Sequence, residues 1–274
     1  MKAAFEIRDP NLVLNDPELF LQISQHSFTY LIIDQEQVAA LAEYHFPETE
    51  TALSAAATLK KIISGQPLLD RVFRKINLVY DLPLSVFVPQ EFFNSASKRN
   101  VLELVYGDVS DLQINHDFMY RQNQQNVYGI PSELHDVVRY LFQSDEIRHF
   151  YSLLPYISTG AGDFMTVVFH PHRITYMLVK DGAPLFVREH RYQSPDDVCY
   201  HLLKAATSFQ LEPDVLELRI HGLIDVKSNL LNELSKYFQR IRPMGLPDHL
   251  RYPESVQAFP AHYFSHYFYL NICV

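Results

Sequence analysis

The chain has 274 residues, of which 47% are hydrophobic, so it is long enough to form two domains of about 100 to 150 residues each. Its formal net charge is −9 and its lysines and arginines never form a run longer than a pair, which argues against a nucleic-acid groove or an anionic membrane surface as partner. Its two cysteines, Cys199 and Cys273, lack the spacing of a thiolate zinc site or a disulfide framework.

The N-terminal segment MKAAFEIRDP carries charged side chains where a secretory signal peptide needs an apolar stretch: Glu6, Arg8 and Asp9. No apolar run in the chain approaches the ~18 residues of a membrane span. We therefore expect a cytoplasmic protein without membrane insertion.

The next segment predicts three successive strands. Their sequences are LFLQIS (19–24), HSFTYLII (26–33) and QVAALAEYHF (37–46). Aliphatic, β-branched and aromatic residues dominate the first two, as is typical of buried strands. Gln25 separates the first two segments, and Asp34 to Glu36 separate the second from the third.

A helix and a fourth strand should follow. Pro47 to Glu50 open the helix, and its apolar stripe follows the spacing i, i+4, i+7, i+11, which forms one helical face: Ala52, Ala56, Leu59 and Ile63. Pro67 then leads into the strand KINLVY (75–80). The predicted unit is strand, strand, strand, helix, strand.

The middle of the chain predicts three further elements. PLSVFVPQEFF (83–93) is expected to continue the first sheet, and residues 111–130 form a hairpin with a polar tip. PSELHDVVRYLF (131–142) predicts an amphipathic helix that begins at Pro131 and Ser132.

The chain then repeats itself at an offset of 146 positions (172 − 26), because HRITYMLV (172–179) echoes HSFTYLII. At the same offset LFLQIS falls on MTVVFH (165–170), and Glu43 falls on Glu189 inside the strand APLFVREHRY (183–192). Three strands in common register indicate an internal duplication.

The second helix repeats the stripe of the first, and both stripes are expected to face the sheets: Val198, Leu202, Ala205 and Phe209. Ser194, Pro195 and Asp197 read as its N-cap, first residue and capping-box acid. Pro213 falls on Pro67 and leads into LELRIHG (216–222), where the register slips by a few residues.

The glycine-containing segment ISTGAGD (157–163) precedes this second copy and lacks the lysine and hydroxyl residue of a phosphate loop, so it predicts a linker. We therefore expect two domains, residues 1–157 and 158–274. The second domain should end with a helix over VKSNLLNELSKYFQRI (226–241) and an aromatic tail, AHYFSHYFYLNICV (261–274).

The order of elements places the chain in the α/β class, with two domains that are each a mixed sheet flanked by helices. Several strings, namely FEIRD, the paired HSFTYLII and HRITYMLV strands, SVFVPQEFF and VYGIPSEL, give it a more specific likeness. Through them the chain resembles an uncharacterised bacterial family of unknown function with an actin-like ATPase fold, distantly similar to pilus-assembly and cell-division actin homologues. That resemblance implies duplicated ribonuclease-H-like domains.

The resemblance also implies two phosphate-binding hairpins, in which an aspartate organises Mg²⁺ and a glycine lets backbone N–H groups approach the phosphates. In the first hairpin the two positions are Gln22 and Ser24, and in the second they are Val168 and His170. Neither Gln22 nor Val168 carries a charge for a metal. Gly222 lies where the ATPases have adenosine-binding glycines, although a lone glycine at a strand end is commonly a turn.

Histidines offer two alternative metal sites. His170 and His172, with His190 across the hairpin, could share one face, but the sequence places no carboxylate or cysteine beside them. His262 and His266 lie one helical turn apart, where packing of an aromatic helix into a core is the competing interpretation. We assign no metal, no cofactor and no catalytic residue.

We therefore expect a pseudo-ATPase, that is, an actin-like scaffold or protein-interaction module whose partner is another protein. The 17 tyrosines and 19 phenylalanines could supply exposed aromatics for such a surface. One alternative is a divergent nucleotide-binding phosphotransferase or ATP hydrolase that uses the inter-domain cleft, with Asp163 or Asp225 as its acid. Another is self-association into a homo-oligomer. Nucleotide binding tests the first alternative, and size in solution tests the second.

Overall fold

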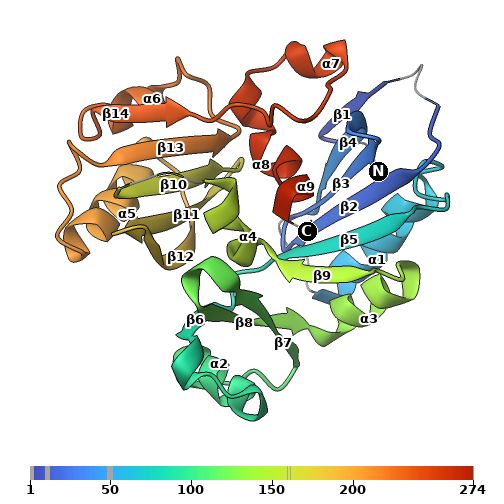
Figure 1. Ribbon diagram of the computed structural model, residues 1–274, viewed down its shortest axis with the longest axis horizontal. Coiled ribbons are helices and arrows are strands. Elements are labelled where there is room, and N and C mark those ends of the chain that lie inside the picture. The colour runs from blue at the N-terminus through green and yellow to red at the C-terminus, as the bar shows by residue number, and fades with distance from the viewer. Residues whose placement is uncertain (1–2, 10–12, 48–51, 159, 161, 274) are drawn as a thin grey trace. The chain divides into compact units, whose positions relative to one another are not determined.

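The computed structural model describes residues 3–9, 13–47, 52–158, 160 and 162–273, and these divide into two compact units (Figure 1). The first unit runs to Leu153 and includes Asp248–Ala258, and the second comprises Leu154–Pro247 and Phe259–Cys273. The division lies close to the predicted boundary after residue 157 but differs from it, because residues 248–258 return to the first unit.

The first unit contains a mixed sheet in the order β1-β4-β3-β2-β5-β9. Its strands and main helix are β1 (Phe5–Arg8), β2 (Pro17–Ser24), β3 (Ser27–Asp34), β4 (Gln37–His45), α1 (Ala52–Ser64), β5 (Lys75–Asp81) and β9 (Glu146–His149). β2, β3 and β4 are antiparallel neighbours, whereas β5 is parallel to β2 and β9 is parallel to β5. The predicted order of three strands, helix and strand is confirmed.

A second, three-stranded sheet in the first unit has the order β6-β8-β7. It contains β6 (Ser85–Pro89), α2 (Lys98–Tyr106), β7 (Leu112–Met119), β8 (Gln124–Pro131) and α3 (Ser132–Leu141). The predicted hairpin and amphipathic helix are confirmed here. The prediction that residues 83–93 continue the first sheet is wrong: Pro83 follows β5 closely and has no N–H for a ladder, and β6 pairs with β8 instead.

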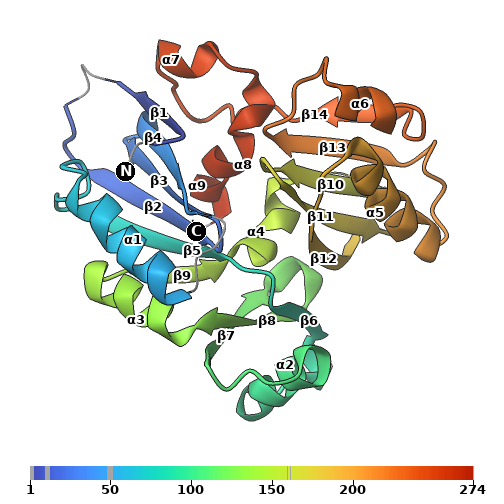
Figure 2. The ribbon, with the colours of Figure 1, turned by 180° about the vertical axis from the view of Figure 1, so that it is seen from behind.

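Helices α1 and α3 pack together, and Figure 2 shows both on the same side of the first sheet. Ala56 and Leu59 are buried there, and Ile63 is half-buried against the same core. The side chain of Ala52 and the predicted helix start at Glu48 to Glu50 lie outside the described residues. The sheet contributes buried residues from β2, β3 and β5 to the same core: Leu21, Tyr30 and Tyr80.

The second unit contains a sheet in the order β12-β11-β10-β13-β14. Its elements are β10 (Phe164–Phe169), β11 (Arg173–Lys180), β12 (Ala183–Arg191), α5 (Pro195–Ser208), β13 (Glu217–Gly222), α6 (Asn229–Leu234), β14 (Arg240–Pro243), η4 (Ala261–Tyr263), α8 (Ser265–Phe268) and α9 (Leu270–Cys273). α4 (Phe150–Ile157) crosses the division between the units, and α7 (Glu254–Gln257) belongs to the first.

The hairpins of the two units agree residue by residue at the offset of 146 positions (173 − 27). β3 and β4 fall on β11 and β12 without a shift, and both ladders have an irregularity at the same place, between Ile32 and Ile33 and between Leu178 and Val179. The turns also agree, because residues 35 and 36 and their counterparts 181 and 182 all have positive φ. β5 and β13 agree at 142 positions (217 − 75), which confirms the predicted slip.

Helix α5 begins as predicted. Ser194 accepts a hydrogen bond from the N–H of Asp197, whose carboxylate accepts from the N–H of Ser194, and Pro195 is the first helical residue. Val198, Leu202 and Ala205 are buried in the core of the second unit.

Two expectations for the second unit are wrong. Phe209 follows the end of α5 and is 38% exposed, with its ring 5.3 Å from that of Phe186 at the margin of the sheet. The helix predicted over residues 226–241 is confined to α6, because the following turns lead into β14.

Candidate functional site

The first hairpin turn is closed on its own side chains. Ser24 ends β2 and is buried, and its hydroxyl oxygen accepts hydrogen bonds from the backbone N–H groups of His26 (3.0 Å) and Ser27 (2.8 Å). It also lies 3.0 Å from the Ser27 hydroxyl. In a phosphate-binding turn such N–H groups donate hydrogen bonds to the anion, whereas here they donate to the serine hydroxyl.

Gln22 lies two residues earlier on β2 and is also buried. Its side-chain amide donates to a carboxylate oxygen of Asp81 at 3.2 Å. Asp81 is the last residue of β5 and pairs with Ser24 across the parallel strands. Sequence reasoning missed Asp81, although it is an acid at a parallel strand end, where α/β sheets usually carry their ligand-binding residues. The arrangement is one carboxylate beside a neutral amide.

The second hairpin is more apolar. Val168 is fully buried in β10, and the N–H of His170 donates to the carbonyl of Arg173 at 2.9 Å, which closes the turn. The carbonyl of His170 accepts from the hydroxyl of Tyr192 at 3.0 Å. The backbone around His170 is therefore engaged within the second unit.

Gly222 ends β13 with φ of +84°. A Cβ at this position would lie 2.1 Å from the carbonyl oxygen of Phe169, and the N–H of the next residue, Leu223, donates to that same oxygen at 2.8 Å. Only glycine permits this approach of β13 to β10. Gly222 thus has a packing requirement that is independent of adenosine.

A buried polar layer covers the face of the second sheet opposite α5. Arg173 and Glu189 form an ion pair there with both side chains almost fully buried. The ring nitrogens of His221 lie 2.6 Å from the hydroxyl of Ser265 and 3.3 Å from that of Ser158. These contacts satisfy polar groups that would otherwise be costly to bury.

The histidines considered as alternative metal ligands are not gathered at one place. His190 pairs with Ile174 on the face that carries α5, where it stacks on His201 at 3.8 Å, whereas His172 lies in an exposed turn. Of the second pair, His262 is buried with Nε2 2.7 Å from the carbonyl of Ile224, and His266 is buried beside the ring of His221. Within the part of the chain that the structure describes, no three histidine, cysteine, aspartate or glutamate side chains are close enough to hold a metal ion.

Burial of His221 gives the stability of the protein a dependence on pH. Burial, with the neighbouring His262 as a second cause, lowers the pKa of His221 to about 3. The unfolded chain binds a proton at this residue near pH ~6.5 and the folded chain does not, so stability is full above that pH and falls as the pH drops toward 3. At pH 5 we expect His221 alone to account for a loss of about 2 kcal/mol.

Urea unfolding at pH 7.5 and pH 5.0 measures this loss, and His221→Asn should unfold with a smaller difference between the two pH values than the wild type. His172→Asn, in the exposed turn, is the control and should keep the wild-type difference. Equal differences for wild type and His221→Asn would contradict the assignment.

The described ranges contain no helix that is both long and apolar enough to cross a membrane. The fold has solved relatives: the chain is 15% identical, with a TM-score of 0.76, to a Bacteroides thetaiotaomicron protein with an actin-like ATPase fold and unknown function, covering 94% of this chain and 96% of that one. The PilM-PilN type IV pilus biogenesis complex matches at 12% identity and a TM-score of 0.62, covering 93% and 98%. The ethanolamine utilization protein EutJ from Carboxydothermus hydrogenoformans matches at 9% and 0.50, covering 96% and 92%.

These similarities show that the chain is a mixed α/β protein with an actin-like ATPase fold. Residues 12–241 match the family described as "Protein of unknown function (DUF3822)", and the chain belongs to that family. No curated protein matches it.

Proposed function

We propose that this protein is a non-catalytic actin-like scaffold, a pseudo-ATPase that acts in the cytoplasm by binding another protein. The observation that carries the proposal is the first hairpin turn, in which the Ser24 hydroxyl accepts hydrogen bonds from the backbone N–H groups of His26 and Ser27. Val168 at the second metal-organising position supports it, because an apolar side chain cannot orient a hydrated cation.

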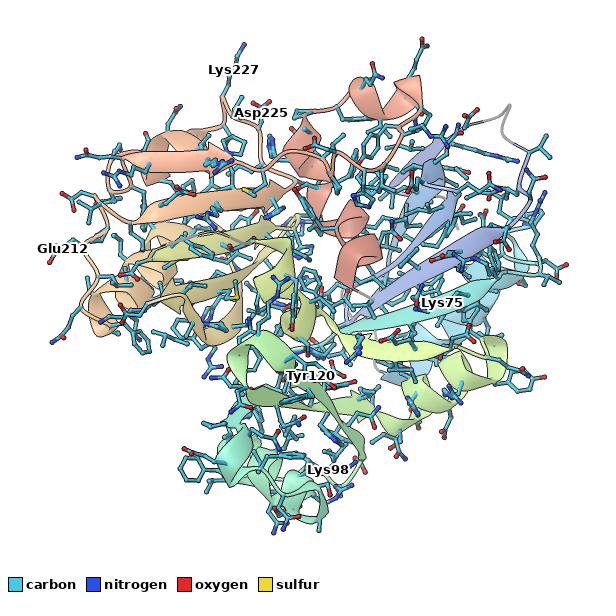
Figure 3. All side chains as sticks on the ribbon, viewed as in Figure 1. Lys75, Lys98, Tyr120, Glu212, Asp225 and Lys227 are labelled. Carbon is cyan, nitrogen blue, oxygen red and sulfur yellow. The ribbon has the colours of Figure 1, made fainter. Side chains whose placement is uncertain are left out.

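Protein binding is supported by exposed aromatic side chains and by the nature of one neighbour. Phe92 is 74% exposed and Tyr120 is 78% exposed. Tyr120 lies in the connection between β7 and β8 (Figure 3). Large exposed aromatics are enriched in protein interfaces. PilM, which has a related fold, is known in a complex with PilN.

We further propose that each unit is one ribonuclease-H-like domain and that the two arose by duplication. The shared strand order, the coincident ladder irregularities and the matching positive-φ turns support a common origin. After duplication the two hairpins diverged separately, to Gln22 and Ser24 in one and to Val168 and His170 in the other.

Nucleotide binding tests the proposal. A competent site with a dissociation constant near ~10 μM would stabilise the folded state by about 2.7 kcal/mol in ~1 mM Mg-ATP. That stabilisation would raise the melting temperature by about 5 °C or more, because ~1 kcal/mol shifts a domain of 150–250 residues by ~2 to 4 °C. We expect no shift with Mg-ATP, Mg-ADP or Mg-GTP, and no release of phosphate above a buffer blank.

An actin-like ATPase of known activity, measured under the same conditions, is the positive control. A magnesium-dependent rise of several degrees in this protein would reject the pseudo-ATPase and leave a divergent phosphotransferase or ATP hydrolase as the better proposal.

A further inference from the structure

The two large sheets differ at one edge. In the first unit β1 covers the outer edge of β4, where the N–H of Ala4 donates to the carbonyl of Glu43 at 2.8 Å and the N–H of Asp9 donates to that of Ala39 at 2.9 Å. In the second unit β12 is the corresponding strand, and it ends the sheet (Figure 1). No strand among the described residues pairs with its outer side.

The common register identifies the main-chain groups at this open edge. Ala39 and Leu41 of β4 correspond to Leu185 and Val187 of β12, so the N–H and C=O groups of these two residues point away from β11. The carbonyl of Val187 accepts a hydrogen bond from the guanidinium of Arg188 at 3.1 Å, which fits this outward direction. β12 therefore offers the same ladder that β4 uses to bind β1.

The side chains of β12 differ from those of β4, because no strand in the part of the chain that the structure describes covers the outer edge of β12. Arg188 is exposed, whereas its counterpart Ala42 is fully buried. On the same face, α5 presents exposed Tyr200 and Lys204, with the ammonium group of Lys204 5.5 Å from the centre of the Tyr200 ring. Burial and then the neighbouring His201 are the main causes that lower the pKa of His190 on this face to about 4, and the positive charges of Arg188 and Lys204 add smaller contributions. A basic and aromatic surface thus borders an open strand in a protein of net charge −9.

We propose that the outer edge of β12 binds an extended segment of a partner protein as an added antiparallel strand, with an acidic side chain opposite Arg188 and an apolar one opposite Val187. β1 shows the pattern, because its Glu6 pairs with Ala42 and its Ile7 pairs with Leu41, the counterparts of Arg188 and Val187. Main-chain hydrogen bonds supply the affinity of such strand addition, and the alternate side chains supply its specificity. The inference rests on the proposed protein-binding role and names its surface.

A second copy of the chain is a poorer occupant. Its β1 is already bound in its own sheet, so donating that strand to β12 would uncover β4 and yield no net gain in main-chain hydrogen bonds. The remaining interpretation is that Arg188 only protects an exposed edge against aggregation, as charged residues at edge strands commonly do.

The probe is a fluorescein-labelled peptide with the sequence AFEIRD, residues 4–9 of this chain, added to the full-length protein. We expect saturable binding by fluorescence anisotropy and slower hydrogen–deuterium exchange in residues 183–191. Arg188→Glu should weaken binding at least tenfold, and the same peptide with lysine in place of its glutamate should bind Arg188→Glu more tightly than the wild-type protein.

Lys227→Glu is the matched control, since Lys227 extends from the loop after β13 (Figure 3) and should leave peptide affinity unchanged. Equal affinity of Arg188→Glu and wild type, or slowed exchange in residues 37–45 instead of 183–191, would overturn the inference. So would a concentration-dependent dimer in sizing chromatography that Arg188→Glu abolishes. If any of these results is obtained and Mg-ATP still does not raise the melting temperature, the scaffold proposal stands.

Discussion

Replacing Glu189 by Gln should lower the free energy of unfolding by about 3 kcal/mol or more, because it leaves the buried guanidinium of Arg173 without its carboxylate. Both side chains of this ion pair are almost fully buried. Removal of one partner from a buried pair typically costs ~3 to 5 kcal/mol, and the amide oxygen of the introduced glutamine retains one hydrogen-bond acceptor, so the lower part of that range is expected. Urea unfolding at pH 7.5 measures the change.

The exposed pair of Lys236 and Glu233 provides the matched control. Glu233→Gln should cost less than about 1 kcal/mol, as is usual for solvent-exposed ion pairs. The double variant Arg173→Met with Glu189→Leu should recover most of the stability, since an apolar pair needs no desolvation of charge. A loss below about 1 kcal/mol for Glu189→Gln would show that the Arg173 charge is solvated in the native state.

The sequence was most informative where one pattern occurs twice. The strand echo at 146 positions predicted the hairpins of both units, because alternation between the faces of a strand fixes which residues can occupy a given register. The cap at Ser194 and Pro195 was equally readable, since a capping box is a local hydrogen-bonding unit.

Non-local pairing was not readable in the same way. Residues 85–89 have the composition of a strand in either sheet, and their membership is decided by β8, which lies about forty residues further along the chain. Phe209 continued the spacing of its helix stripe, but α5 ends at Ser208, and the periodicity contains no information on that end. Apolar periodicity identified elements better than it identified their ends or partners.

The contacts of the candidate site residues could not be derived from their sequence positions. Gln22 and Ser24 were identified through a resemblance. The contact of Gln22 with Asp81 depends on the parallel pairing of β2 with β5, whereas the contacts of Ser24 with the turn amides are local to the hairpin. Asp81 is 59 residues from Gln22 in the chain, and no local motif joins them.

The repeat also shows how the two polar faces diverged. Glu43 and Glu189 occupy the same place in the two sheets, but Glu43 lies 3.1 Å from the ring of His45, whereas Glu189 pairs with Arg173. Ser27 is the counterpart of Arg173 and contacts Ser24 instead. An acid retained at one strand position is thus satisfied by different partners, which explains why equal sequence positions need not give equal sites.

Gly222→Ala should be the other strongly destabilising substitution, with a loss of about 3 kcal/mol or more. An alanine at φ of +84° is strained, and its Cβ would lie 2.1 Å from a backbone oxygen that cannot rotate away. A residue forced into an unfavourable backbone region costs ~1 to 3 kcal/mol, and separation of β13 from β10 to relieve the clash adds the loss of ladder hydrogen bonds.

Gly245→Ala is the control, because a Cβ there would meet no atom within 4 Å and its φ is not positive. It should leave unfolding within about 0.5 kcal/mol of wild type. If Gly222 served nucleotide binding alone, Gly222→Ala would unfold at the wild-type urea concentration. If Gly222 is instead required for the close packing of β13 on β10, Gly222→Ala should lose much of its stability without nucleotide, and Mg-ATP should leave the melting temperature of the wild-type protein unchanged.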